Sequence, residues 1–189
     1  FYSFRKVELL TIKNIGDKSM LNPKISKLLN DQINKEFYSS YLYLDMSNFY
    51  IDNNLKGFGN WFAIQTQEEY AHAMLFLKYM LNNGEKVTLG TIAAPDIKFN
   101  DLKAPLDAAM EHEYFITASI NEIYAAAYEV KDFRTMQFLD WFVKEQGEEE
   151  QNTDDLCKRF DRFGNDPKSL YLLDNELSTR VFNPPSLVI

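Results

Sequence analysis

Apolar residues recur at every third or fourth position over long stretches of this chain, and that spacing places side chains on one face of an α-helix. The pattern predicts four long helices and a shorter fifth one, at about residues 22–50, 55–83, 101–130, 132–163 and 166–180. Residues typical of helix ends bound them, with Asn22 and Pro23 at the first start and Gly84 and Gly164 after the second and fourth helices. The sequence therefore predicts an all-α chain.

The connections between these helices predict how they are arranged. Short turns join the first helix to the second and the third to the fourth, so each pair is expected to form an antiparallel hairpin. The link at residues 85–101 contains prolines and β-branched residues and has no helical period. At ~3.3 Å per residue this link reaches about 55 Å, whereas the second helix, at ~1.5 Å per residue, is about 40 Å long. The sequence thus predicts a four-helix bundle with one long crossover between the second and third helices, plus a short fifth helix.

A carboxylate interrupts the apolar face of each long helix. The clearest case is the face of the second helix, which comprises Phe58, Phe62, Gln65, Glu69, His72, Phe76 and Tyr79. Glu36, Glu113 and Glu149 interrupt the apolar faces of the other three helices in the same way. An unpaired buried carboxylate costs several kcal/mol, and four of them facing one core would also repel each other. A bound multivalent cation is the simplest way to stabilise this arrangement.

The donor atoms of these residues favour iron or manganese as that cation. The middle positions of two antiparallel hairpins meet at one level of a bundle, so the four acids are expected to converge. Glu69 and His72 lie one helical turn apart and can hold one metal ion together. Carboxylate oxygens with one imidazole nitrogen are mostly hard ligands that suit iron or manganese, whereas structural zinc sites are rich in Cys and His.

The length and charge of the chain further restrict the classes of function that it can have. The 189 residues are enough for one well-packed domain and few for two. A formal charge of -8 argues against a nucleic-acid or anionic-membrane partner, because both attract basic surfaces, and it fits cations as the ligands. The single cysteine, Cys157, excludes an internal disulfide, and no apolar run is long enough to span a bilayer. These features together predict a cytoplasmic protein.

The chain is expected to divide into three parts. Residues 1–19 do not resemble the rest of the chain and lack the apolar core of a signal peptide. Because Met20 directly precedes the first helix start, this stretch is interpreted as an upstream extension or as sequence added for expression, with an arm at a subunit contact as the alternative. Residues 20–185 are expected to form the helical domain, and residues 186–189 a short tail.

Four short segments resemble those of the non-haem ferritins, particularly the prokaryotic type, and the resemblance extends over residues 20–185. The segments are NKEFYSSYLY at 34–43, QEEYAH at 67–72, EHE at 111–113 and EQGEEE at 145–150. A single Glu-x-x-His motif is a weak signal, but four acids within apolar helix faces make the combination a strong one. The resemblance implies that family's four-helix fold and a ferroxidase centre that holds two iron ions per subunit.

The resemblance also assigns residues to each iron position. Glu36, Glu69 and His72 would hold the first iron, and Glu69, Glu113 and Glu149 the second, with Glu69 bridging and Gln146 nearby. A third position would fall to Glu68, Glu145, Glu148 and Glu149. Tyr43 matches a tyrosine next to the family's diiron centre, where it is a candidate one-electron donor. Without the resemblance, the additional acids of the third position are also explained as solvated side chains, and Tyr43 as a packing residue.

Two positions depart from the pattern of the wider family. Bacterioferritins and rubrerythrins have a second Glu-x-x-His on the fourth helix, but here Asn152 stands three residues after Glu149. The resemblance therefore favours a ferritin proper, without haem. Gly147 stands where the family often has histidine, and a glycine inside a helix costs about 1 kcal/mol relative to alanine.

The resulting hypothesis is an iron-storage ferritin whose subunit oxidises Fe(II) with O2 or peroxide and whose product is stored as a ferric oxide mineral. Storage requires a container, so the resemblance implies a homo-oligomeric shell of twenty-four subunits, with the fifth helix at the four-fold contacts. Two alternatives stay open. One is another diiron oxidase or peroxidase that acts on a small substrate without storing mineral, and the other is a helical assembly protein with no enzymatic activity.

Overall fold

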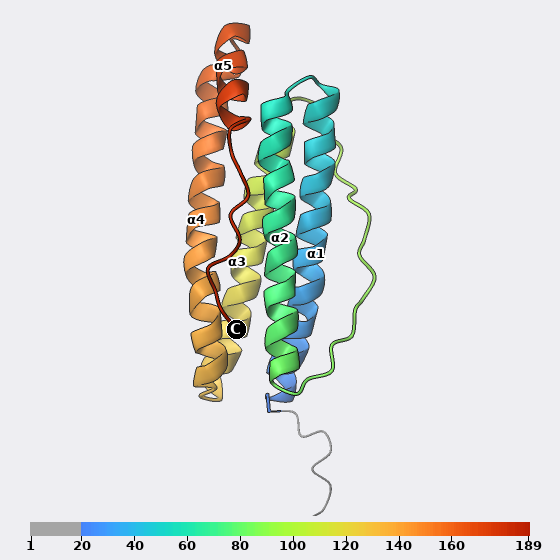
Figure 1. The fold of residues 1–189 in the computed structure, drawn as a ribbon, viewed down its shortest axis with the longest axis vertical. Coiled ribbons are helices and arrows are strands. Elements are labelled where there is room, and N and C mark those ends of the chain that lie inside the picture. The colour runs from blue at the N-terminus through green and yellow to red at the C-terminus, as the bar shows by residue number, and fades with distance from the viewer. Residues whose placement is uncertain (1–19) are drawn as a thin grey trace, which may run out of the picture.

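The computed structural model describes residues 20–189, and this part of the chain is built from helices and connecting segments without strands. The helices are α1 (Pro23–Asp52), α2 (Lys56–Asn82), α3 (Ala104–Glu129), α4 (Phe133–Phe163) and α5 (Pro167–Leu177), as Figure 1 shows. The predicted all-α class and five-helix order are confirmed, although α5 ends three residues before the expected Arg180. No helix within residues 20–189 is both long and apolar enough to cross a membrane. The expectations for residues 1–19 lie outside the described residues.

Side-chain caps explain where most of the helices begin. Asn22, Asp132 and Asp166 each accept a hydrogen bond from a backbone N–H in the first turn of α1, α4 and α5. Such caps satisfy donors that have no partner inside the helix. The start of α2 has no cap of its own, because Leu55 precedes it. We find that the cap comes from α5, where Asp174 Oδ1 accepts from the backbone N–H groups of two residues of the first turn of α2.

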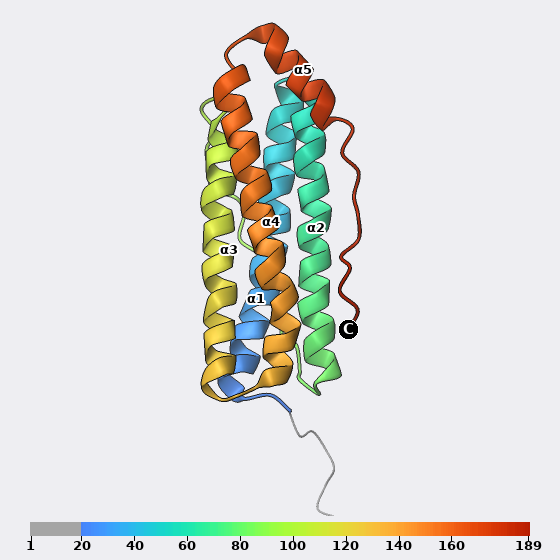
Figure 2. The same ribbon diagram turned by 90° about the vertical axis from the view of Figure 1, so that its left-hand side faces the viewer.

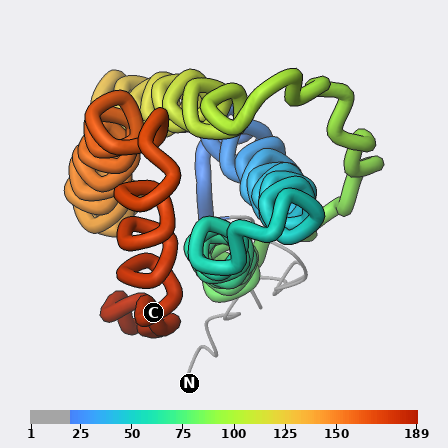
Figure 3. The backbone as a smooth tube through the Cα atoms, turned by 90° about the horizontal axis from the view of Figure 1, so that it is seen from above, coloured from blue at the N-terminus to red at the C-terminus, as the bar shows by residue number. Residues whose placement is uncertain are grey.

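The link between α2 and α3 crosses the length of the bundle, as the sequence predicts. It lies outside the bundle on the side of α1 (Figures 1 and 3). Near the beginning of α1, the Asn30 side chain exchanges two hydrogen bonds with the backbone of Thr88, at 2.9 and 2.8 Å. Near the end of α1, the Tyr50 hydroxyl donates to the Leu102 carbonyl at 2.6 Å. The link is therefore fastened to both ends of α1, and the two hairpins are held in register.

The four helices do not pack against one another equally. Helix α1 packs against α2 and α3, and α3 packs against α4, but the Cα atoms of α2 and α4 stay more than 8 Å apart. The segment after α5, residues 178–189, runs back along the bundle beside this wider gap (Figures 1 and 2). Trp141 of α4 donates a hydrogen bond to Ser186 of this segment at 3.1 Å, which fastens the segment to the bundle.

A polar layer divides the apolar core into two parts. One part includes Ile33, Phe76, Ile116 and Phe142, and the other includes Tyr43, Phe62, Ala109 and Leu156. Glu36, Glu69, Glu113 and Glu149 each lie along their helix between a residue of one part and a residue of the other. All four are buried, so the carboxylates lie inside the bundle at the level where the two apolar parts separate.

Gly147 and Gly57 are expected to respond in opposite ways to alanine. Beyond its own helix backbone, a Cβ at Gly147 would meet no atom of residues 20–189 within 4 Å, so Gly147→Ala should stabilise the fold by about 1 kcal/mol. A Cβ at Gly57 would lie 1.6 Å from the backbone oxygen of Asp174, so Gly57→Ala should displace α5 and destabilise the fold. Urea unfolding followed by circular dichroism measures both changes. A less stable Gly147→Ala protein would contradict this account, in which nothing in the structure requires glycine at 147.

Candidate metal centre

Glu36 of α1 and the pair Glu69 and His72 of α2 come together in the polar layer. One donor atom from each of the three lies within 4.8 Å of the others, and each of the three residues is at most 2% exposed. His72 Nδ1 lies 3.5 Å from Glu69 Oε2, as expected for residues one turn apart on a helix. Two carboxylates and one imidazole therefore face a shared position that a metal ion could occupy.

Neutral amide groups hold two of the buried carboxylates in place. Gln32 Nε2 donates to Glu36 Oε1 at 2.8 Å within α1, and Gln65 Nε2 of α2 donates to Glu149 Oε2 of α4 at 2.9 Å. The other carboxylate oxygen of Glu36 has no hydrogen-bond partner among the described residues. A buried acceptor without a donor is costly, and a cation would satisfy it.

Glu113 of α3 is held by groups from two other helices. The hydroxyl of Tyr43 in α1 donates to Glu113 Oε1, and Gln146 Nε2 of α4 donates to Glu113 Oε2 at 3.1 Å. Both oxygens of this carboxylate therefore already accept one hydrogen bond. Both Tyr43 and Gln146 were assigned to the site from the sequence. In the structure each of them donates a hydrogen bond to one of the four buried acids.

Burial and mutual repulsion both disfavour the charged forms of these acids. Burial is the larger cause, and together with the neighbouring Glu69 it raises the pKa of Glu36 from 4.5 to about 8. Burial and the nearby Glu113 raise the pKa of Glu149 to about 7. The pKa of Glu69 lies well above its ordinary value because this residue is buried and faces both Glu113 and Glu149. No Lys or Arg within residues 20–189 forms a salt bridge with any of the four acids, so the layer lacks a fixed cation.

A second group of acids, which shares Glu149 with the buried four, lies on the side of the gap between α2 and α4. Glu68, Glu145, Glu148 and Glu149 line a cavity of about 250 Å³ together with His72 and part of the C-terminal segment. Glu68 and Glu145 are partly buried, whereas Glu148 is exposed and pairs with Lys144 at 2.9 Å. Glu68 Oε2 pairs with Arg180 Nη2 at 2.6 Å. The acids that the sequence assigns to a third position therefore share one cavity, and two of them already have positively charged partners.

Comparison with known proteins identifies the family. A family model described as the ferritin-like domain matches residues 26–163, which is well over half of the chain. The chain belongs to the ferritin family. This result confirms the resemblance that the four sequence segments predicted.

Individual relatives agree with this assignment. A probable bacterial non-heme ferritin-like protein of Haemophilus influenzae is 36% identical over 158 residues, which cover 84% of this chain and 96% of that protein. A bacterial non-heme ferritin of Campylobacter jejuni is 37% identical over 155 residues, with 82% and 93% covered. The solved structure of an open pore ferritin from Archaeoglobus fulgidus is 38% identical, with a TM-score of 0.84, and the match covers 87% of this chain and all of that one.

Family membership confirms the general function expected from the sequence. Non-haem ferritins bind and store iron and are ferroxidases, so this ferritin belongs to an iron-oxidising class of enzymes. The structural match likewise confirms the four-helix bundle with a short fifth helix. Within this bundle, Glu36, Glu69 and His72 form the buried group that could hold a metal ion.

Three residues of the site in this ferritin were given no role in the sequence analysis. Gln32 and Gln65 each lie four residues before a buried acid on the same helix face, and this spacing was a signal that could have been used. The partner of Gln65 is nevertheless on another helix, because its amide reaches Glu149 and not Glu69. Arg180 gave no comparable signal, since it lies beyond the last helix and has no periodic pattern around it.

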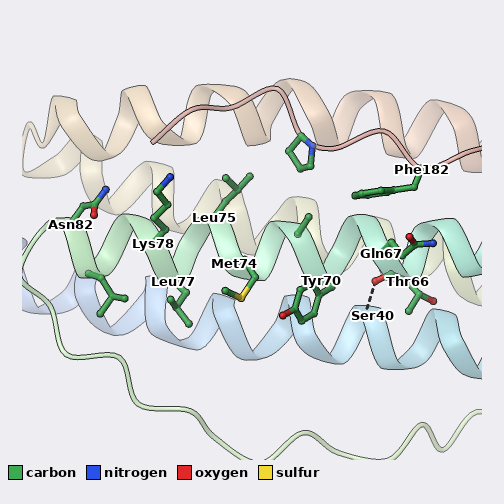
Figure 4. Close-up of a pocket in the computed structure, with 13 residues that line it drawn as sticks. Ser40, Thr66, Gln67, Tyr70, Met74, Leu75, Leu77, Lys78, Asn82 and Phe182 are labelled. Atoms are coloured by element: carbon green, nitrogen blue, oxygen red, sulfur yellow. Dashed lines mark hydrogen bonds between the residues drawn. The ribbon is translucent and has the colours of Figure 1, made fainter.

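An apolar groove of about 850 Å³ lies along the outer face of α2 in this ferritin. Figure 4 shows Tyr70, Met74 and Leu77 of α2 in this groove, with Phe182 of the C-terminal segment on its other side. No carboxylate of residues 20–189 lines the groove. It therefore differs in chemistry from the acid-lined cavity and is a surface suited to apolar contacts.

The metal-free protein is expected to become less stable as the pH rises from about 4.5 to about 8. In this range the folded protein retains a proton on Glu36 that the unfolded chain releases, because its pKa is 4.5 ordinarily and about 8 in the fold. The contribution of Glu36 to the free energy of unfolding is therefore largest below pH 4.5. This contribution is lost as the pH rises through the pKa of about 8 that Glu36 has in the folded protein. Thermal melts in the presence of a chelator, at several pH values, measure the effect.

The Glu36→Gln variant provides the control, because an amide at this position does not titrate. Its loss of stability across the same pH range should be smaller than that of the wild type. An equal loss in both proteins would contradict the assignment of the effect to Glu36.

Proposed function

We propose that this ferritin oxidises Fe(II) at a two-iron centre inside each subunit and stores the product as a ferric oxide mineral within a protein shell. The observation that carries the proposal is the polar layer, in which four carboxylates and His72 are buried without a Lys or Arg partner within residues 20–189. Such a layer is expensive unless cations bind there. Two ferrous ions supply four positive charges and would remove most of that cost.

Each inner residue has a role in this proposal. Glu36 and His72 bind the first ferrous ion, Glu113 and Glu149 bind the second, and Glu69 bridges the two. The amides of Gln32, Gln65 and Gln146 orient carboxylates without neutralising them, as hydrogen-bonding partners of metal ligands commonly do. Because the pKa of several acids is raised, binding of Fe(II) releases protons to solvent.

The reaction is a transfer of one electron from each ferrous ion. Two Fe(II) ions together supply two electrons. These electrons reduce one O2, which takes up two protons to give hydrogen peroxide, or one hydrogen peroxide, which takes up two protons to give two water molecules. Tyr43 is in a position to supply a further electron, since its hydroxyl donates to Glu113 at the centre. The third position at Glu68, Glu145, Glu148 and Glu149 would hold an additional ferrous ion on the way to or from the centre.

Storage requires several copies of the chain, and the outer surface of α1 and α2 supports association. Tyr41 and Leu44 of α1 and Tyr70, Met74 and Leu81 of α2 are all exposed. Large apolar side chains gathered on one face mark contact sites in soluble proteins. We propose that this face packs against another subunit of a twenty-four-subunit homo-oligomer in the cytoplasm. The proposed shell needs no haem, nucleic acid or membrane.

Anaerobic titration with Fe(II), followed by exposure to O2, tests the proposed chemistry. The wild type should bind two or three ferrous ions tightly per subunit, oxidise them rapidly and then take up many more. Glu69→Gln should oxidise Fe(II) at least about 100-fold more slowly, because it loses the bridging carboxylate. Ultraviolet absorbance follows the oxidation, and Glu122→Gln, an exposed acid of α3, is the matched control.

The other outcomes of this titration separate the alternatives. Tight binding without uptake beyond the centre would favour a diiron oxidase or peroxidase that acts on a small substrate. An unchanged rate in Glu69→Gln would contradict the proposed centre, and no binding in the wild type would favour a helical assembly protein.

The proposed shell makes a prediction about mass. Light scattering after size exclusion should give a particle near twenty-four times the 22.1 kDa chain. Met74→Glu should shift this particle toward smaller species, because a charge buried in an apolar contact is costly. Met74→Leu preserves the apolar surface and should leave the particle intact. A monomer as the only wild-type species would refute the shell.

A further inference from the structure

Arg180 stands three residues after the end of α5 and is held firmly against α2. Its Nη2 pairs with Glu68 Oε2 at 2.6 Å, and its Nη1 donates to the Trp61 carbonyl at 3.3 Å. The guanidinium carbon lies 4.8 Å from the centre of the Trp61 ring, within the range of a cation–π contact. The side chains of Arg180 and Glu68 are only 23% and 16% exposed. This ion pair is therefore more shielded from solvent than a surface pair.

The backbone around Arg180 is also fixed. Asn60 Nδ2 of α2 donates to the carbonyls of Leu177 and Arg180, at 3.2 and 3.0 Å. Farther along, Ser186 accepts the hydrogen bond from Trp141 of α4. The segment between these two anchors, which contains Asn183, Pro184 and Pro185, forms one wall of the acid-lined cavity. Arg180 is thus presented to this cavity by a segment that is attached to both helices beside the gap.

The position of the guanidinium matters because Glu68 is one of the acids proposed to bind a third ferrous ion. A carboxylate oxygen that accepts a short, charge-assisted hydrogen bond from Arg is less available to a metal. A ferrous ion beside Glu68 would also be repelled by the neighbouring guanidinium. A metal ion in the outer cavity and the Arg180–Glu68 pair therefore compete for the same carboxylate.

We propose that Arg180 is a built-in counter-cation of the outer cavity, which releases Glu68 only when a third metal ion binds there. The inference rests on the proposed function, since it concerns the access of iron to the same centre. Within residues 20–189 the inner acids form no ion pair with Lys or Arg, so they bind metal first and the outer position fills last. The C-terminal segment thereby sets the order in which the positions are occupied.

Calorimetric titration of the intact, metal-free protein with Zn(II), which undergoes no redox reaction, tests this order. The wild type should bind two equivalents tightly and a third more weakly. Arg180→Gln should tighten the third equivalent by about tenfold and leave the first two unchanged, because one shielded ion pair no longer competes. Arg180→Lys keeps the charge and should bind the third equivalent more like the wild type. Glu68→Gln should lose the third equivalent.

Tryptophan fluorescence gives a second measurement that does not require substitution of Arg180. The chain has two tryptophans, and the difference in emission between the wild type and Trp61→Phe gives the contribution of Trp61, the ring beneath the guanidinium, while Trp141 keeps its hydrogen bond to Ser186. The contribution of Trp61 should change with the third Zn(II) equivalent and not with the first two. As a control, the same change should be absent in Arg180→Gln.

The outcomes separate this inference from the proposed function. If the first two equivalents bind tightly but the third is unchanged or weaker in Arg180→Gln, the role of Arg180 is wrong and the two-metal centre stands. A Trp61 signal that does not follow the third equivalent would also overturn it. If the wild type fails to bind even the first two equivalents, the proposed centre itself is wrong.

Discussion

The burial of four carboxylates between two apolar halves of one core is the constraint on which the rest of this structure depends. Burial raises the pKa of Glu36 to about 8 and that of Glu149 to about 7, which shows how strongly the site opposes unneutralised charge. Only a rigid frame keeps such groups together at all. The two hairpins and the link fastened at Asn30 and Tyr50 of α1 supply this frame, because they fix the level at which the four helices meet. The fold is therefore best understood as a means of holding repelling groups close enough to share metal ions.

Much of this arrangement can be predicted from the helical spacing of apolar residues alone. This spacing gives information about each helix separately. The spacing of Glu69 and His72, and the apolar neighbours of Glu36, indicate which side chains enter the core. Connection lengths then predict the crossover. The spacing of apolar residues within one helix does not give the rotation of that helix relative to its neighbours. For this reason it did not predict the hydrogen bonds from Gln65 to Glu149 and from Gln146 to Glu113. These contacts depend on the packing of complete helices.

Contacts made by the chain after α4 were still harder to predict. The first turn of α2 contains Gly57, and a glycine there gave no indication that α5 approaches it closely enough to exclude a Cβ. The cap provided by Asp174 and the ion pair made by Arg180 both join residues more than one hundred positions apart. Neither helix propensity nor spacing carries information over such distances. The expected end of α5 was also wrong by three residues, since Arg180 contacts α2 instead of extending the helix.

The choice of hydrogen-bond donors explains how the protein can hold acids in place and still leave them ready for metal. The donors to the inner carboxylates are amides and a phenol, from Gln32, Gln65, Gln146 and Tyr43. A neutral donor orients a carboxylate but leaves its charge in place, whereas a Lys or Arg would neutralise it and make metal binding less favourable. Among residues 20–189, the arginine that pairs with a carboxylate of the proposed metal positions is Arg180 at the outer cavity, and it is attached to a segment outside the four-helix bundle. A cation on that segment can be displaced without disturbing the bundle, but a cation on one of the four helices could not.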